Sequence, residues 1–205
     1  MNDMTYSTTE RAALLGVALA SIKSGLQTGR ALKPDAGNYP PALTETRASF
    51  VTLNHDNTLR GCIGSLEPCT SLVSSVADNA YAAAFRDPRF PVLTLPELSG
   101  LTIQLSVLSP LQAVAYDSEA DLLRQLQAGI DGWVIQEKGS RGTFLPSVWE
   151  TLPDPRLFLE HLKQKAGLAT DYWSDTIEVW RYSTESFSAP VEEIEKDLAE
   201  IIIAE

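Results

Sequence analysis

The chain has 205 residues, which is long enough for one well-buried core, and its 44% apolar and 21% charged residues are typical of a folded protein. A formal net charge of −11 surrounds the molecule with a negative field, so nucleic acid and anionic membranes are excluded as expected partners. Because no apolar run is long enough to span a membrane and residues 1–9 lack the pattern of a secretory signal, we expect a cytoplasmic protein.

An amphipathic helix is predicted at the start of the chain. Ser7 and Glu10 have the spacing of a capping box, and apolar residues then recur at helical intervals until Gly25 and Gly29 interrupt the pattern. The following segment, 32–46, is rich in proline and is predicted to be an irregular connector.

A β-hairpin is predicted next. Residues 50–53 form a β-type run, 55–57 a turn and 58–64 a return strand. The return strand contains Gly61 and Gly64, and glycine in a strand is tolerated mostly where another backbone or a ligand approaches closely. The hairpin is therefore a candidate functional site.

A helix with a buried face follows the hairpin, with Thr70 in position to cap it. Asn79 projects into the same arc as the apolar residues of this helix. An amide on a buried face needs hydrogen-bond partners, so Asn79 is either a satisfied structural residue or part of a site. Asp87 precedes Pro88, which ends the helix.

The remaining elements mix strands and helices without a regular βαβ order. The predicted segments are a strand at 101–108, a helix at 121–127, a strand at 133–137, a hairpin turn at 139–142, a helix at 156–167 and a strand at 177–182. The fold class is therefore α+β, with a largely antiparallel sheet flanked by helices.

The domain organisation follows from these elements. Residues 1–189 are predicted to form one domain, and residues 190–205 an acidic amphipathic tail. The apolar residues of the tail at helical spacing are Ile194, Leu198, Ile201 and Ile202. In the helix at 156–167 the side chains predicted to point inward are Leu157, Phe158, Leu159 and Leu162.

Four ordered blocks of sequence resemble the AMMECR family, which also supplies protein A of AmmeMemoRadiSam systems. The first block, residues 59–64, reads LRGCIG and looks like the hallmark of that family. Residues 79–91, 101–110 and 129–168 agree with the further blocks in the same order. Several ordered blocks are much more specific than one short motif.

The resemblance implies an α+β fold with a larger and a smaller lobe. It also implies a chain often encoded near a Memo-like protein, which resembles metal-dependent dioxygenases, and near a radical SAM protein. The family has no settled reaction to carry over, so candidate chemistry comes from the residues themselves.

Cys62 is the candidate catalytic residue. Alternation along the strand puts Arg60 and Cys62 on one face, where the guanidinium could stabilise a thiolate nucleophile. The alternative is a small buried core cysteine. Six residues separate Cys62 from Cys69, which fits neither a CxxC motif nor a zinc knuckle, and no phosphate-binding loop or dinucleotide fingerprint occurs. We therefore expect no metal site and no cofactor.

The candidate binding residues lie in the hairpin and in the segments after it. They are Arg60, Gly61, Gly64, Glu67, Asn79, Asp87, Arg89 and Arg141. Asp87 and Arg89, with Arg86, lie beside rigid prolines and suit recognition of a carboxylate or phosphate, or else pair with each other and with backbone carbonyls. Arg141 could reach over the same cleft or remain at a solvated hairpin tip, and Glu67 has a plain turn explanation.

Two functional hypotheses follow. In the first, the protein is a cytoplasmic accessory to Memo-like and radical SAM partners, and the LRGCIG hairpin and the loop from Asp87 to Phe90 form its binding surface. In the second, it is an enzyme that acts on a small molecule, with Cys62 as a reactive thiol and Arg60 and Arg89 binding an anionic group. No oligomeric state follows from the sequence.

Overall fold

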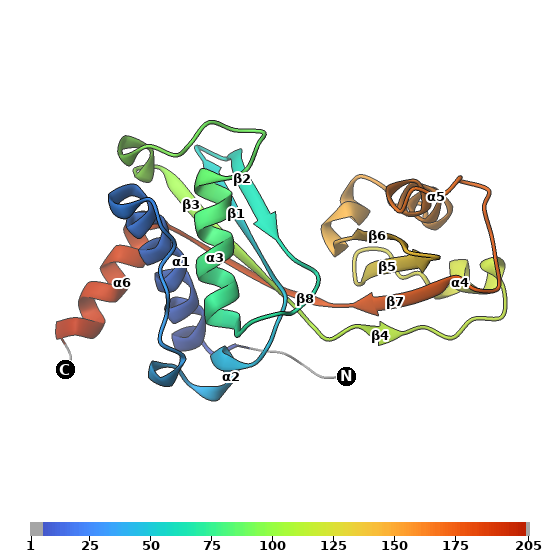
Figure 1. Cartoon of the computed structure of the whole chain (residues 1–205), viewed down its shortest axis with the longest axis horizontal. Helices are drawn as coiled ribbons and strands as arrows, with labels where there is room; N and C mark the ends of the chain where they lie inside the picture. The colour runs from blue at the N-terminus through green and yellow to red at the C-terminus, as the bar shows by residue number, and fades with distance from the viewer. Residues whose placement is uncertain (1–5, 204–205) are drawn as a thin grey trace. The chain divides into compact units, whose positions relative to one another are not determined.

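A computed structural model describes residues 6–203, with side chains described from residue 6 to residue 199. The chain divides into two compact units (Figure 1): the first runs to Leu108 and resumes at Glu185, and the second is the continuous segment Ser109–Thr184. Each unit has its own antiparallel sheet flanked by helices. The predicted α+β class and the larger and smaller lobes are therefore confirmed.

The elements of the first unit surround one sheet. They are α1 (Thr8–Thr28), η1 (Ala36–Asn38), α2 (Pro41–Thr44), β1 (Ser49–His55), β2 (Thr58–Gly64), α3 (Leu72–Phe85), η2 (Leu95–Leu98), β3 (Leu101–Leu108), β8 (Thr184–Pro190, from its second residue) and α6 (Val191–Ile203). The strand order is β2-β1-β3-β8, so β2 and β8 are the edge strands.

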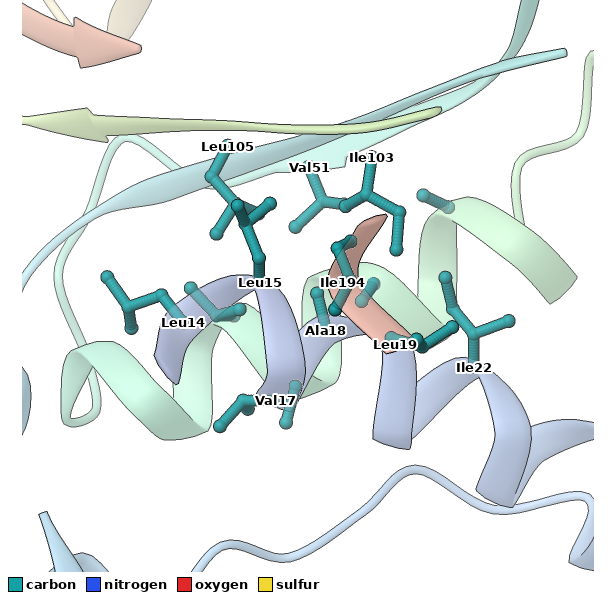
Figure 2. Packing of buried hydrophobic residues seen from close by; sticks show 14 of the residues in the cluster. Leu14, Leu15, Val17, Ala18, Leu19, Ile22, Val51, Ile103, Leu105 and Ile194 are labelled. Atoms are coloured by element: carbon teal, nitrogen blue, oxygen red, sulfur yellow. The ribbon is translucent and has the colours of Figure 1, made fainter. Parts of the chain in front are cut away.

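One face of this sheet carries the first core. Val51 in β1 and Ile103 and Leu105 in β3 are fully buried against α1 and α3, and Figure 2 shows them facing Leu15 and Ile194. The alternate residues of β1 and β3 are half-buried and mostly polar, as expected for a sheet with one covered face.

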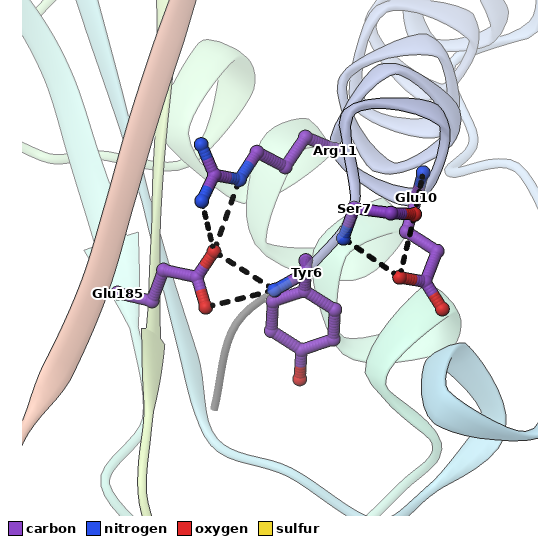
Figure 3. A network of polar contacts seen from close by, with 5 residues as sticks. All are labelled: Tyr6, Ser7, Glu10, Arg11 and Glu185. Atoms are coloured by element: carbon purple, nitrogen blue, oxygen red, sulfur yellow. Dashed lines mark hydrogen bonds and ion pairs between the residues drawn. The ribbon is translucent and has the colours of Figure 1, made fainter. Parts of the chain in front are cut away.

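The capping box predicted for α1 is present, and β8 is tied to it. Ser7 and Glu10 exchange the two capping hydrogen bonds. Figure 3 shows the Glu185 carboxylate accepting the Tyr6 backbone N–H at 3.1 Å and the Arg11 Nε at 3.0 Å. Strand β8 was not predicted, because its sequence, TESFSAP, has too few apolar residues to show alternation.

The predicted cap of α3 was wrong by one residue. The helix begins at Leu72, and Ser71, not Thr70, occupies the N-cap position. Ser71 makes no capping bond to the backbone, and its hydroxyl contacts Ser74 instead at 2.9 Å. The backbone at Leu72 also donates to Glu45, so tertiary contacts select the start of the helix.

The segment expected as an acidic tail forms α6. Val191 and Ile194 are buried in the core of the first unit. Leu198 packs close to α1, because a Cβ atom added at Gly16 would lie 3.1 Å from its Cδ2. The Ile201 and Ile202 side chains lie outside the described part of the chain. Within the described residues, no helix is long and apolar enough to cross a membrane.

The second unit has the strand order β4-β7-β5-β6. Its elements are β4 (Gln112–Ala113), α4 (Glu119–Gln125), β5 (Gly132–Glu137), β6 (Ser140–Phe144), η3 (Pro146–Glu150), α5 (Pro155–Lys165) and β7 (Glu178–Tyr182). The rings of Trp149 and Phe158 stack in its core, with centroids 3.7 Å apart.

Two local predictions in the second unit were wrong. The β5–β6 turn lies at Lys138 and Gly139, which both have positive φ, so Arg141 is inside strand β6 and not at the tip of the hairpin. Leu157, predicted to point inward, is 47% exposed. At helical spacing it shares the exposed side of α5 with His161 and Gln164, away from the buried Phe158, Leu159 and Leu162.

Candidate functional site

The two glycines of the LRGCIG hairpin allow close packing in the first unit. A Cβ atom at Gly61 would lie 2.2 Å from the carbonyl oxygen of Ala83, so β2 approaches the backbone of α3 at that point. A Cβ at Gly64 would lie 2.3 Å from the Phe50 ring. Since Gly61 faces α3, strand alternation directs Cys62 to the opposite face. Arg60 is the extra residue of the bulge opposite Leu53 and Asn54, so the simple alternation expected for Arg60 and Cys62 does not hold there.

Cys62 lies in a row of side chains that crosses the sheet. Thr52 is its cross-strand partner in β1, and Gln104 in β3 is the next residue in register. The Thr52 hydroxyl donates a hydrogen bond to the Cys62 Sγ at 3.2 Å. The thiol is half-buried in this row and is not part of the apolar core on the other face.

An ion pair covers the free edge of β2 at Cys62. The Asp87 carboxylate accepts the Cys62 backbone N–H at 2.9 Å, and Arg89 Nη2 donates to the Cys62 carbonyl at 3.2 Å. Arg89 also donates to Asp87 through Nε at 2.9 Å and through Nη2 at 2.6 Å. The pair therefore replaces the missing neighbouring strand at this peptide group.

The electrostatics of this pair follow from its hydrogen bonds. The pKa of Asp87 lies far below its usual range, mainly because the Arg89 guanidinium donates hydrogen bonds to the carboxylate. The backbone N–H groups of Cys62 and Arg89 lower this pKa further. Burial of the carboxylate acts in the opposite direction and is outweighed. The Asp87 side chain is 2% exposed whereas that of Arg89 is 55% exposed.

A second ion pair engages Arg60. Its Nε and Nη2 donate to the two carboxylate oxygens of Glu97 in η2, at 2.7 and 3.3 Å. The hydrogen bond from Arg60 is the main cause that lowers the pKa of Glu97 to about 2. Buried Nη1 of Arg60 has no hydrogen-bond partner among the residues that the structure describes.

Asn79 has a structural explanation. Its amide nitrogen donates to the Ser49 carbonyl at 3.0 Å and lies 3.2 Å from the Ser49 hydroxyl and 3.3 Å from the Ser75 hydroxyl. These bonds join α3 to the start of β1. Asn79 is thus a satisfied amide, the first of the two readings that its position allows.

Three of the candidate residues are joined by direct contacts. Direct contacts join Cys62, Asp87 and Arg89, while Arg60 is held by Glu97. Glu67 is exposed in the loop after β2. Arg141 belongs to the second unit, where it lies opposite Gln136 in the β5–β6 ladder.

Sequence reasoning missed Glu97 and Thr52, the side-chain partners of Arg60 and Cys62. Glu97 had a usable signal, because Thr94 and Glu97 have capping-box spacing and do form that box. No sequence signal pointed to Thr52, because its pairing with Cys62 depends on the bulge at Leu53 and Asn54, which shifts the cross-strand register. Within the described side chains no three His, Cys, Asp or Glu residues are arranged to hold a metal ion.

The loop that carries Asp87 and Glu97 also exposes apolar side chains. Val92 is 59% and Leu95 68% exposed, and Leu59 at the start of β2 is 40% exposed. Leu93, between them, is buried and donates its backbone N–H to Ala84. Leu93 therefore anchors the loop to α3, while Val92 and Leu95 point to solvent. We call Leu59, Val92 and Leu95 the apolar rim.

Comparison with known proteins agrees with this architecture. Protein MJ0810 of Methanocaldococcus jannaschii is 34% identical over 73% of this chain and 77% of its own length. Protein PF1979 of Pyrococcus furiosus is 34% identical over 85% of each chain. The fold is also similar to the crystal structure of the uncharacterized protein PH0010 from Pyrococcus horikoshii, with a TM-score of 0.77. The sequence identity is 33%, and the match covers 86% of this chain and 90% of that chain.

A family profile described as AMMECR1 matches residues 15–187, which include the LRGCIG hairpin and every strand of both sheets except the end of β8. The match covers most of the chain and includes the blocks that carry the resemblance in the sequence. The chain therefore belongs to the AMMECR1 family.

Proposed function

We propose that this protein is a cytoplasmic accessory protein that binds Memo-like and radical SAM proteins through the LRGCIG hairpin and the loop from Asp87 to Glu97. The partner classes come from the family resemblance. The surface is proposed from local positions: Leu59 precedes Arg60 in the hairpin, and Val92 and Leu95 lie in the loop that carries Arg89 and Glu97.

The observation that carries the proposal is the internal pairing of Arg60 and Arg89. Each guanidinium is bonded to a carboxylate, at 2.7 Å for Arg60 with Glu97 and 2.6 Å for Arg89 with Asp87. A carboxylate already balances the charge of each arginine and occupies its Nε and Nη2 donors, so an anionic substrate would gain less from binding there. The Asp87 and Glu97 bonds also tie the loop that carries Val92 and Leu95 to β2, and exposed apolar side chains on an anchored loop favour a protein partner.

The test is binding of the purified Memo-like and radical SAM proteins of the same organism, measured by calorimetry with the full chain. The double variant Val92→Asp, Leu95→Asp should weaken binding by about 10-fold or more, because it places two charges on apolar surface that the partner would bury. Leu157→Asp is the matched control, since Leu157 is also exposed and lies in the second unit.

Unchanged affinity in the double variant, or no binding of either partner by the wild-type chain, would reject the proposed surface. Equal loss in the Leu157→Asp control would also count against it, because the effect would then not be specific to the rim.

One observation favours the second candidate, a thiol enzyme. The Thr52 hydroxyl donates to Cys62 Sγ at 3.2 Å, and a thiolate would accept that bond more strongly than a thiol. With Cys69→Ser in the background, native Cys62 should react with iodoacetamide at a rate near that of a free thiol if it is a nucleophile, and more slowly after Thr52→Val. Protection of Cys62 until the protein unfolds would exclude this candidate.

A further inference from the structure

A small polar cavity of about 140 Å³ lies between α4 and α5 in the second unit. The lining residues are Glu119, Ala120, Leu123, Arg156, Leu159 and Glu160. Sites for drug-sized ligands occupy roughly 300–1,000 Å³, so this cavity admits only a small metabolite. None of its residues belongs to the surface proposed above, which lies in the first unit.

A buried lysine, Lys163, fixes the position of Glu119. Lys163 is fully buried, and its ammonium group donates to Glu119 Oε1 and to the Thr170 carbonyl. It also lies 5.4 Å from the centre of the Trp173 ring. A buried ammonium is costly unless it is paired, so this arrangement offsets the charge of Glu119 and holds its carboxylate at the cavity wall. The second oxygen, Oε2, has no bond among the described residues.

Arg156 and Glu160 supply the remaining charges of the cavity. They are four residues apart on α5, with the arginine N-terminal to the glutamate, which is the weaker order for pairing along a helix. Within the described part of the chain neither side chain forms an ion pair or a hydrogen bond. One cation and one anion therefore face the cavity without an internal partner, and Leu123 and Leu159 add apolar surface.

We infer that this cavity binds a small zwitterion of the α-amino acid type. Arg156 would bind the carboxylate by the bidentate geometry that guanidinium groups favour, and Glu160 with Glu119 Oε2 would accept hydrogen bonds from the ammonium group. The side chain of the ligand would lie against Leu123 and Leu159. A phosphate or other multiply charged anion fits less well, because two carboxylates line the same space.

The experiment is a titration of the full-length ¹⁵N-labelled protein with L-alanine and L-valine, followed by amide shifts in α4 and α5. A ligand of this size should bind with a dissociation constant on the order of 1 mM. Ethylamine, which lacks the carboxylate, and propionate, which lacks the ammonium group, should each bind about 10-fold more weakly, since each loses one charged contact.

Variants assign the binding to the cavity. Arg156→Gln and Glu160→Gln should each weaken binding by about 10-fold. Arg124→Gln is the matched control and should leave it unchanged, because Arg124 is an exposed arginine of α4 that pairs with Asp121 and does not line the cavity. Thermal melting checks that each variant is folded.

Three results would overturn the inference. They are the absence of a saturable shift with either amino acid, equal affinity for propionate and L-alanine, and amino-acid binding that Arg156→Gln leaves intact.

Discussion

Asp87 illustrates how a single residue can look like a binding group in sequence and serve the fold in three dimensions. Its carboxylate accepts the backbone N–H groups of Cys62 and Arg89 and the guanidinium of Arg89. All these partners belong to the protein itself. The loop-staple reading, in which the aspartate and arginine pair with each other and with the backbone, therefore describes the observed contacts.

Replacement of Asp87 by Asn should destabilise the protein. The amide keeps one acceptor oxygen but turns an N–H₂ group toward donors, so at least one buried N–H loses its partner. We expect a loss of about 1–3 kcal/mol in the free energy of unfolding, at the modest end because Arg89 is largely solvated. Urea unfolding at neutral pH measures it. Asp78→Asn, on the exposed face of α3, should change little, and equal midpoints for the two variants would contradict the prediction.

Glu97 should make stability depend on pH in the acid range. Its pKa falls from 4.5 to about 2 on folding, mainly through the hydrogen bond from Arg60. A lowered pKa in the folded state stabilises the protein above the unfolded value, and this contribution disappears as the pH falls from about 4.5 toward 2. The melting temperature of Glu97→Gln should therefore be lower than that of wild type at neutral pH, with the gap narrowing in this window. A constant gap down to the lower pH would argue against it.

At the scale of elements, the packing of β2 on α3 decides what the LRGCIG hairpin can tolerate. The contact at Gly61 is with a main-chain carbonyl, which cannot rotate away as a side chain can. The sequence indicated a close approach by a backbone or a ligand at these glycines, and at Gly61 the approaching group is the backbone of α3.

Gly61→Ala should destabilise the first unit by roughly 1–3 kcal/mol or more, because the added methyl forces β2 and α3 apart. Gly37→Ala is the control, since its Cβ would lie 3.4 Å from Asp35 Oδ1, an ordinary contact. Chemical denaturation of both variants compares them. A Gly61→Ala protein as stable as wild type would show that the two elements can separate at little cost.

For the whole molecule, the two hydrophobic cores indicate that the first and the second unit each have their own free energy of unfolding. The second unit is a continuous segment with its own cluster of buried residues around Trp133 and Phe158. Local opening follows such cooperative units, so each unit can have its own free energy of opening.

Phe158→Ala should therefore loosen the second unit selectively. Loss of a buried aromatic side chain costs about 3–5 kcal/mol. Hydrogen exchange read by mass spectrometry should show faster exchange in β5, β6 and α5, with β1 and β3 still protected. Leu105→Ala, in the core of the first unit, should give the reverse pattern. Uniform acceleration in both variants would mean that the chain opens as a single unit.

The sequence by itself determined the elements whose signal is local. The capping box at Ser7, the β1–β2 hairpin with its turn at Asp56 and Asn57, and the alternating strand β3 all follow from neighbouring residues, and all are present. The family was also readable, because its blocks lie in order along the chain.

The tertiary structure decided the features that depend on distant residues. Strand β8 exists because it pairs at the edge of a sheet formed much earlier in the chain, and α3 begins where contacts from the preceding loop place it. The partners of Arg60 and Cys62, namely Glu97 and Thr52, come together only through strand register and loop path. Residue type and spacing specify local conformation, whereas the charge balance of a site depends on which side chains the fold brings within hydrogen-bond distance.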